Sequence, residues 1–298
     1  MPVVRLRVPA LSGRRWILGS GARRLKAALT LASVAVTMLA VAHPRAQTGV
    51  PETALRNYDT ILDTHVRDGR VYYRALRSER SKLDSFITAL ASASIEGASR
   101  NDQVAFWLNA YNAFVLRSVI DQYPIAVRTR EYPAKSIRQI PGVFERTPRR
   151  VAGRTLTLDQ IEQNVLPAFN DPRVFFALGR GAVGSGRLRS EPYSGAELER
   201  QLSEIAAECV HRATCIDIDR GGNMVRASSV FSWRERDFVT GYAEKADPRF
   251  ASRSPIERAV IGFIAPKLLL TEEQFMERNE FQLRFLPFDW TLNDLTGH

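Results

Sequence analysis

The sequence contains very little cysteine and histidine. Only two of its 298 residues are Cys and only four are His. Outside the basic N-terminal segment the histidines are His65, His211 and His298, and none is spaced from another His or from a Cys as zinc ligands are. We therefore expect no metal site and no cofactor.

Acidic residues are absent from residues 1–46, and the first acid is Glu52. This segment carries eight cations, an apolar run from Ala27 to Ala42, and a further small residue at Ala46. The order is typical of a secretory signal peptide. We predict that residues 1–46 are a signal peptide, that residues 47–298 form one domain, and that the protein is exported to the periplasm or secreted.

The details of export stay open. The apolar run is shorter than the ~20 residues that span a bilayer, but an uncleaved signal anchor is the alternative. A mitochondrial transit peptide is disfavoured because the run is too continuous to be amphipathic. Cleavage could follow Ala42 or Ala46, and arginine pairs at 14–15 and 23–24 leave Sec and twin-arginine export both open.

The charge of the remaining chain is close to neutral. Removing the eight leader cations takes the net charge from +10 to +2, so the basic total gives no argument for nucleic acid or anionic lipid. We expect no nucleic-acid partner and, if the signal is cleaved, no stable membrane insertion. Other partners stay unknown.

The two cysteines, Cys209 and Cys215, are close in the sequence. In an oxidising compartment they could form a local disulfide, and a short loop of this kind is worth about 2 kcal/mol on the chain-entropy estimate. The alternative is that they are two small buried apolar side chains.

Residues 101–123 read NDQVAFWLNAYNAFVLRSVIDQY and predict a helix around which the chain packs. Apolar residues recur with helical spacing and also fill most of the circumference, which indicates a buried helix. Asn101 or Asp102 could cap its start. Asn109 and Asn112 lie inside the apolar stretch, and a buried amide without partners costs about 1–3 kcal/mol. We expect them either to hold a loop against the helix or to bind a ligand.

The remaining patterns predict a helix-dominated α+β domain with a small, mostly antiparallel sheet around the buried central helix. Capping boxes begin at Thr157, Ser194 and Ser254. We expect strands in VAGRTL (151–156), CIDID (215–219), MVRA (224–227) and 281–288, with RVFFAL (173–178) as the strongest strand candidate.

Several sequence blocks resemble the family of domain of unknown function 547. The central AFWLNAYNAF (105–114) is similar to the AFWxNAYNA signature of that family. Further blocks follow the family's order: DGRVYY (68–73), LTLDQIEQNVL (156–166), DPRVFFAL (171–178), LRSEPY (188–193), VFSWRERDF (230–238) and LPFDWTLN (286–293). The resemblance extends over residues 58–293 and implies no established activity.

The chain departs from the family pattern at its reactive residues. Relatives typically read HFALxCASxGCPPLR where this chain reads FFALGRGAVGSGRLR (175–189). The family His corresponds to Phe175, its first Cys to Arg180 and its second Cys to Ser185, while the His of its IEH block corresponds to Gln163. If relatives use a Cys/His pair as nucleophile and base, this chain lacks both. The resemblance therefore implies a divergent member.

Candidate functional residues follow from these blocks. The catalytic candidates are Glu162 and Ser185; the ligand-binding candidates are Asn109, Asn112, Arg180, Arg189 and Asp289. Gly179, Gly181 and Gly184 form a G-x-G-x-x-G pattern, but the next helix begins only after Ser194, so we expect no nucleotide site. We favour a non-catalytic binding or structural role. The alternative is a hydrolase or transferase that acts on a small carboxylate or peptide-like substrate with a divergent active site.

Overall fold

The predicted central helix is present and buried. The computed structural model describes residues 49–126 and 129–296, so the predicted signal peptide and His298 lie outside the described residues. Helix α4 spans Arg100–Gln122, and residues 104–120 are buried with the exception of Arg117. The prediction of its cap was wrong. Ser99 precedes the helix, and its hydroxyl accepts the Asp102 N–H, which satisfies one of the free donors of the first turn.

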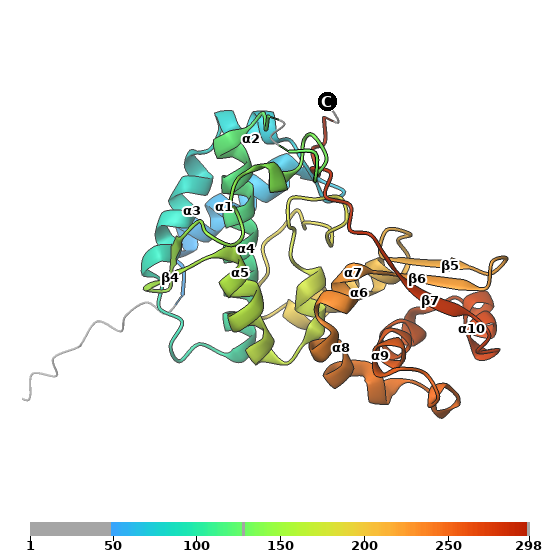
Figure 1. Ribbon diagram of the computed structural model, residues 1–298. Coiled ribbons are helices and arrows are strands. Elements are labelled where there is room, and N and C mark those ends of the chain that lie inside the picture. The colour runs from blue at the N-terminus through green and yellow to red at the C-terminus, as the bar shows by residue number, and fades with distance from the viewer. Residues whose placement is uncertain (1–48, 127–128, 297–298) are drawn as a thin grey trace, which may run out of the picture. The chain divides into compact units, whose positions relative to one another are not determined.

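The N-terminal helices surround α4. Helices α1 (Glu52–His65), α2 (Tyr73–Ser78) and α3 (Ser81–Ser92) contact one another or α4, as Figure 1 shows. The short strands β1 (Val66–Arg67) and β2 (Arg70–Val71) join α1 to α2 as an antiparallel hairpin. The predicted hairpin at 151–156 is confirmed by β3 (Arg149–Val151) and β4 (Arg154–Leu156), which pair antiparallel and pack near α3.

Four short helical turns follow the second hairpin. They are α5 (Leu158–Gln160), the π-helical turn η2 (Ile161–Val165), and the 3-10 turns η3 (Leu166–Phe169) and η4 (Pro172–Phe176), and a further 3-10 turn, η1 (Ile137–Gln139), precedes them. The capping box at Thr157 is confirmed, with Gln160 completing it.

The strand predicted at residues 173–178 was wrong, because this segment forms η4. The Asp171 carboxylate accepts the Arg173 N–H and so caps the turn, and Pro172 supplies a helical φ at its first position. A short, fully buried apolar run has no periodicity that separates a strand from a helical segment.

The C-terminal part holds the larger sheet. Strands β5 (Ile216–Asp219) and β6 (Met224–Ser228) form the predicted antiparallel pair, and β7 (Gln282–Leu286) lies parallel to β6. A parallel partner requires a long connection, which here contains α7 (Ser229–Trp233), α8 (Glu235–Tyr242), α9 (Pro255–Ile264) and α10 (Leu270–Glu277), with the 3-10 turns η5 (Ala243–Lys245), η6 (Pro248–Phe250) and η7 (Ala265–Lys267). The capping box at Ser254 is confirmed. Helix α6 (Leu198–Val210) precedes the sheet and begins later than its predicted cap Ser194.

A cluster of aromatic rings joins η4 to the C-terminal helices. Phe176 lies 5.0 Å from Phe231 and 5.5 Å from Phe263, measured between ring centroids. Phe238 lies 4.6 Å from Phe231. All four rings are buried, so the cluster fixes α7 and α8 against η4. The described residues thus confirm a helix-dominated α+β fold with small, mostly antiparallel sheets.

The segment after β7 returns to the N-terminal elements. The Tyr73 hydroxyl donates to Asn293 Oδ1 at 2.6 Å, and the Val71 N–H donates to the Asn293 carbonyl at 2.9 Å. The Tyr123 hydroxyl donates to Asp294 Oδ2 at 2.6 Å. Residues that are at least 171 positions apart in the sequence therefore bind each other directly.

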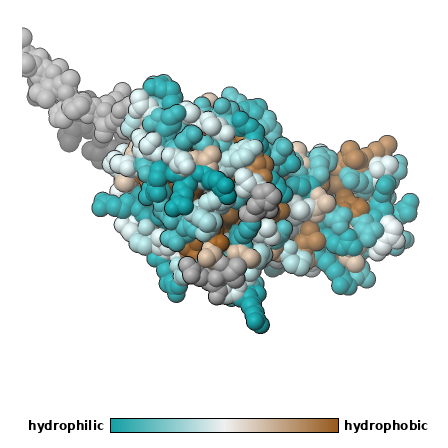
Figure 2. Space-filling model, turned by 90° about the horizontal axis from the view of Figure 1, so that it is seen from above, coloured by the Kyte–Doolittle hydropathy of each residue, from teal (hydrophilic) through white to brown (hydrophobic). Residues whose placement is uncertain are grey.

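The surface is mostly hydrophilic in the view of Figure 2, with hydrophobic patches that include the end carrying the sheet and α10. Leu269 and Leu270, where α10 begins, are 59% and 68% exposed. Within the described ranges, no helix has both the length and the apolar character needed to cross a membrane.

Candidate functional site

The two amides of α4 hold neighbouring loops. Asn109 Nδ2 donates to the Tyr193 carbonyl at 2.8 Å and its Oδ1 accepts the Tyr193 N–H at 2.9 Å. Asn112 Nδ2 donates to the Ala177 carbonyl at 3.1 Å and its Oδ1 accepts the Gly179 N–H at 2.8 Å. Each amide thus pairs with the backbone as an adjacent strand would. Their candidacy as ligand groups stays a prediction, but in this structure both are occupied by the chain itself.

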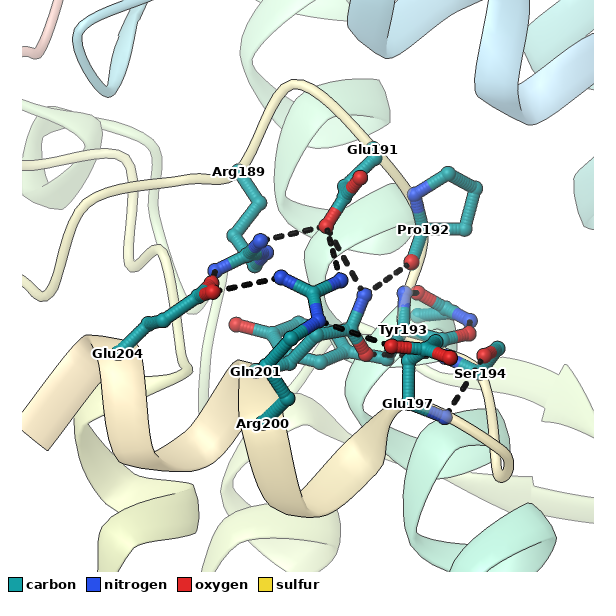
Figure 3. A network of polar contacts seen from close by, with 10 residues as sticks. Arg189, Glu191, Pro192, Tyr193, Ser194, Glu197, Arg200, Gln201 and Glu204 are labelled. Carbon is teal, nitrogen blue, oxygen red and sulfur yellow. Dashed lines mark hydrogen bonds and ion pairs between the residues drawn. The ribbon is translucent and has the colours of Figure 1, made fainter.

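The LRSEPY block is held by charged side chains of α6. Figure 3 shows Arg189 between two carboxylates, with Nη2 2.5 Å from Glu191 Oε1 and Nη1 3.0 Å from Glu204 Oε2. The Gln201 amide donates to the Pro192 carbonyl at 2.9 Å and accepts the Ser194 N–H. Arg189, a predicted ligand-binding residue, therefore takes part in anchoring its own loop to the helix.

Arg180 and Glu162 form a buried, two-point ion pair. Arg180 Nη2 lies 2.6 Å from Glu162 Oε1, and Arg180 Nε donates to Oε2 at 3.2 Å. The Tyr111 hydroxyl also donates to Oε2, at 3.1 Å, and Arg180 Nη1 donates to the Phe175 carbonyl at 3.2 Å. The side chains of Arg180 and Glu162 are only 3% and 8% exposed. Two of the residues predicted from the sequence as site candidates, Glu162 and Arg180, are therefore partners of each other.

The electrostatics of this cluster favour a charged Arg180 and a neutral Tyr111. Burial lowers the pKa of the Arg180 guanidinium, but Glu162 and Tyr111 outweigh this and leave the pKa raised. The pKa of Tyr111 is raised well above its usual value, first by burial and then by the Glu162 carboxylate. Tyr111 therefore stays protonated and acts as a hydrogen-bond donor.

A second arginine, Arg234, lies between α7 and α8 and approaches Phe175. Its guanidinium carbon lies 4.1 Å from the centroid of the Phe175 ring, a cation–π geometry. Its Nη1 donates to Gln163 Oε1, and its Nη2 lies 2.7 Å from Asp237 Oδ2. Sequence reasoning missed Arg234 because it lies 71 residues from Gln163. The sequence feature that could have identified Arg234 is its position inside the VFSWRERDF block (230–238), which resembles the family pattern.

Three of the four positions that differ from the family pattern, Gln163, Phe175 and Arg180, are linked through Arg234. Gln163 contacts Arg234, Arg234 covers Phe175, and the Phe175 carbonyl binds Arg180. An arginine is always protonated and accepts no hydrogen bond, and an amide or a phenyl ring is not a base. These residues can form ion pairs, hydrogen bonds and packing contacts, but they offer neither a nucleophile nor a general base.

The remaining candidates, Ser185 and Asp289, line two other cavities. Ser185 is buried, and its Oγ accepts the Arg180 N–H at 3.0 Å. It lines a cavity of about 180 Å³ together with Arg187 and Arg212. Asp289 is exposed, its Oδ1 accepts the Thr291 N–H, and it lines a different cavity, of about 200 Å³. The structure therefore does not bring the sequence candidates to one cavity.

The glycine-rich loop is shaped by close backbone contact. A Cβ atom on Gly186 would lie 1.6 Å from the Phe176 carbonyl oxygen, so only glycine fits there. Gly181 has a φ of +69°, in the left-handed region that other residues rarely adopt. Close packing explains Gly186, and the backbone conformation explains Gly181. Neither glycine requires a phosphate ligand.

A larger cavity, of about 780 Å³, lies beside Gln163 and Arg234. Its wall comes from η2, η3, η4, α7 and α8, and it includes Trp233, Arg236 and Asp237. It falls in the size range of small-molecule sites. Among the described residues, no group of three or more His, Cys, Asp or Glu is placed to hold a metal ion.

Comparison with known families decides the identity of the central segment. Residues 95–210 match the family described as "Protein of unknown function, DUF547". This central segment is similar to the DUF547 family. No curated protein matches the chain, and no solved structure matches it.

The matched segment includes some of the site residues described above and leaves others out. The DUF547 segment contains both α4 amides, the Glu162–Arg180 pair, Phe175 and Gln163. Trp233, the last residue of α7, and Arg234, which follows it, lie outside the matched segment. The matched segment also reaches Cys209, which forms a disulfide with Cys215, the two Sγ atoms lying 2.00 Å apart.

Proposed function

We propose that this protein is an exported, non-catalytic binding protein whose ligand occupies the cavity beside Gln163 and Arg234. The observation that carries the proposal is the buried Glu162–Arg180 pair. Arg180 occupies the position at which relatives have their first cysteine. The hydrogen-bonding groups of the pair are bound by other groups of the protein. The sealed pair supports a scaffold role for this position.

The absence of an activated nucleophile among the described residues supports the same conclusion. A nucleophile needs a general base within hydrogen-bond reach. Ser185 Oγ accepts the Arg180 N–H, and no hydrogen bond within the described ranges joins that oxygen to a His, Asp or Glu. Glu162, the other catalytic candidate, has both oxygens engaged.

The disulfide and the leader support export. The Cys209–Cys215 bond is of the kind that persists in oxidising compartments, and residues 1–46 have the order of a signal peptide. The proposal is that residues 1–46 are removed and that residues 47–298 act as one domain. Intact mass measurement of the exported protein is expected to give a chain that begins after Ala42 or Ala46. A mass that retains the leader would favour the anchor.

The binding proposal is tested by a thermal-shift screen of the protein produced from the full sequence. The screen uses carboxylates, saccharides and short peptides, and each ligand is recovered afterwards and analysed by mass spectrometry. A ligand at a hundred times its Kd stabilises the protein by about 2.7 kcal/mol. We expect at least one class to raise the Tm and to be recovered unchanged.

Two results would contradict the proposal. If no compound raises the Tm at ten-millimolar concentration, the binding role fails. If a ligand is recovered chemically altered, and the alteration stops in Ser185→Ala or Glu162→Gln protein that still melts cooperatively, the protein is the hydrolase or transferase of the alternative.

A further inference from the structure

The cavity beside Arg234 is lined on one side by Trp233, whose ring packs against other aromatic rings. Trp233 is 45% exposed, although it lies in a tightly packed group of rings. Its ring centroid is 4.8 Å from that of Phe288 and 6.1 Å from that of Trp290, with an angle of 20° between the two indole planes. Phe288 and Trp290 are themselves 4.5 Å apart.

The support of Trp233 extends further into the protein. The Arg138 guanidinium carbon lies 4.5 Å from the Trp290 ring centroid and 4.5 Å from that of Phe144. Trp233 therefore belongs to a stacked set of side chains, and its ring is held in place by these contacts. An aromatic ring held in this way loses little conformational entropy when a ligand stacks on it. An exposed and ordered indole at a cavity is thus suited to binding the flat apolar face of a ligand.

The rest of the cavity lining combines small apolar residues with polar side chains. Besides Trp233, the polar residues of the lining that matter here are Gln163, Asn170, Arg236, Asp237 and Thr240. Together they provide amide, hydroxyl, carboxylate and guanidinium groups, which both donate and accept hydrogen bonds. The arrangement suits a ligand with many hydroxyl groups around an apolar ring face.

The charge of the cavity is not balanced. Arg234 is paired with Asp237 at 2.7 Å. Arg236 is exposed, and no hydrogen bond or ion pair within the described residues engages it. Its planar fork can bind a carboxylate with two hydrogen bonds. One unpaired guanidinium favours a ligand with a single carboxylate over a densely phosphorylated one.

The geometry points to a saccharide that bears a carboxylate, with its ring stacked on Trp233 and its carboxylate on Arg236. A pyranose presents C–H groups on one face and hydroxyls at its edge, which matches an indole surrounded by planar polar groups. A cavity of about 780 Å³ can enclose such a ligand. The inference rests on the proposed binding function and gives it a ligand class.

The test is a titration of the full-chain protein with matched saccharide pairs, followed by Trp fluorescence and calorimetry. The probes are oligogalacturonate, a hyaluronan oligosaccharide and a muramic-acid disaccharide, each beside its methyl ester, which keeps the ring and removes the charge. We expect at least one acid to bind and its ester to bind about tenfold more weakly, the factor that corresponds to 1.4 kcal/mol.

Variants assign the binding to the cavity. Trp233→Ala is expected to weaken the bound acid by tenfold or more, while Trp233→Phe keeps part of the platform and loses less. Arg236→Gln is expected to abolish the preference for the acid over its ester. Tyr72→Ala is the control, because Tyr72 is 41% exposed and is not among the residues that line the cavity. All variants are first compared by thermal melting.

The outcomes separate the ligand class from the proposed function. If no acid binds but the thermal-shift screen yields another ligand, the saccharide inference fails and the binding function stands. If an acid binds but neither Trp233→Ala nor Arg236→Gln changes its affinity, the inference fails as well. If the saccharide binds and is cleaved, the site stands and the non-catalytic assignment fails. If neither experiment yields a ligand, both fail.

Discussion

Arg180 and Arg234 both contact Phe175, yet their surroundings differ. Arg180 is enclosed by Glu162, Tyr111 and the Phe175 carbonyl, all of them protein groups. Arg234 is also buried, but its partners Gln163 and Asp237 line a cavity of about 780 Å³. The first guanidinium completes an interior, whereas the second forms the floor of a space that solvent can fill.

The contrast shows which part of the site can still bind a ligand. A buried charge needs its partner, because its removal leaves an ion without compensation. A charge beside a hydrated cavity can exchange a protein partner for water or for a ligand. The proposed binding function therefore assigns a structural role to the sealed region and places recognition in the open region around Trp233.

The largest expected effect breaks the sealed pair. Glu162→Gln leaves Arg180 buried without a counter-charge, and such a loss costs about 3–5 kcal/mol of unfolding free energy. Asp237→Asn, the matched change in the open region, is expected to cost clearly less, because water in the cavity can solvate Arg234. Urea unfolding of both variants measures the difference. Equal losses would remove the distinction between the two regions.

A double variant sharpens the same comparison. Glu162→Leu combined with Arg180→Met removes both charges, and replacing a buried ion pair with apolar side chains is often neutral. We expect stability close to that of the original protein and far above that of Glu162→Gln alone. A double variant no more stable than the single one would show that the pair also holds the local backbone.

The next effect concerns the amide that fastens the sealed region to α4. Asn112→Leu leaves the Ala177 carbonyl and the Gly179 N–H without their partner, at about 1–3 kcal/mol for each buried group. Asn101→Leu, on the exposed first turn of the same helix, is the control. Thermal melting distinguishes them. An Asn112→Leu protein with an unchanged Tm would show that this amide does not act as a clamp.

A smaller effect lies outside both regions. Replacing Cys209 and Cys215 with Ala removes the local disulfide, and the chain-entropy estimate for so short a loop is about 2 kcal/mol. Denaturation with and without reductant should give this difference for the original protein and none for the variant. Free thiols detected in the denatured, unreduced protein would contradict the bond.

The smallest effect is a pH dependence at the end of α1. His65 is buried, and burial lowers its pKa below 6.5, although Glu79 at 3.4 Å opposes the shift and Arg67 and Lys82 add to it. Below pH 6.5 the unfolded chain binds a proton that the folded chain binds less well, so stability falls as the pH falls, by at most about 1.4 kcal/mol per pH unit. Melting of the original protein and of His65→Gln between pH 7.5 and 5.5 should show a flatter profile for the variant.

Local chemistry explains which predictions held. The capping boxes at Thr157 and Ser254 and the hairpins at 149–156 and 216–228 depend on neighbouring residues, and all are confirmed. The strand predicted at 173–178 failed because its apolar run carries no period, and its cap Asp171 decided the backbone. The parallel pairing of β7 with β6 has no local signal.

The candidate site was predictable only in part. Buried polar residues must find partners, so the sequence indicated that Asn109 and Asn112 bind either a loop or a ligand. It could not indicate that Arg234 meets Gln163 or that Trp233 stacks on Phe288, because these contacts join segments that are distant in the chain. The cavity depends on such contacts and therefore appears only in the folded protein.

The return of residues 293–294 to the N-terminal helices has a consequence for biosynthesis. Tyr73 binds Asn293 across 220 positions, and Tyr123 binds Asp294 across 171. While the ribosome is still making the intervening segments, these two tyrosines have no partners for their hydroxyl groups. The helices around α4 can thus collapse early, but they reach their final packing only after residue 294 has left the exit tunnel.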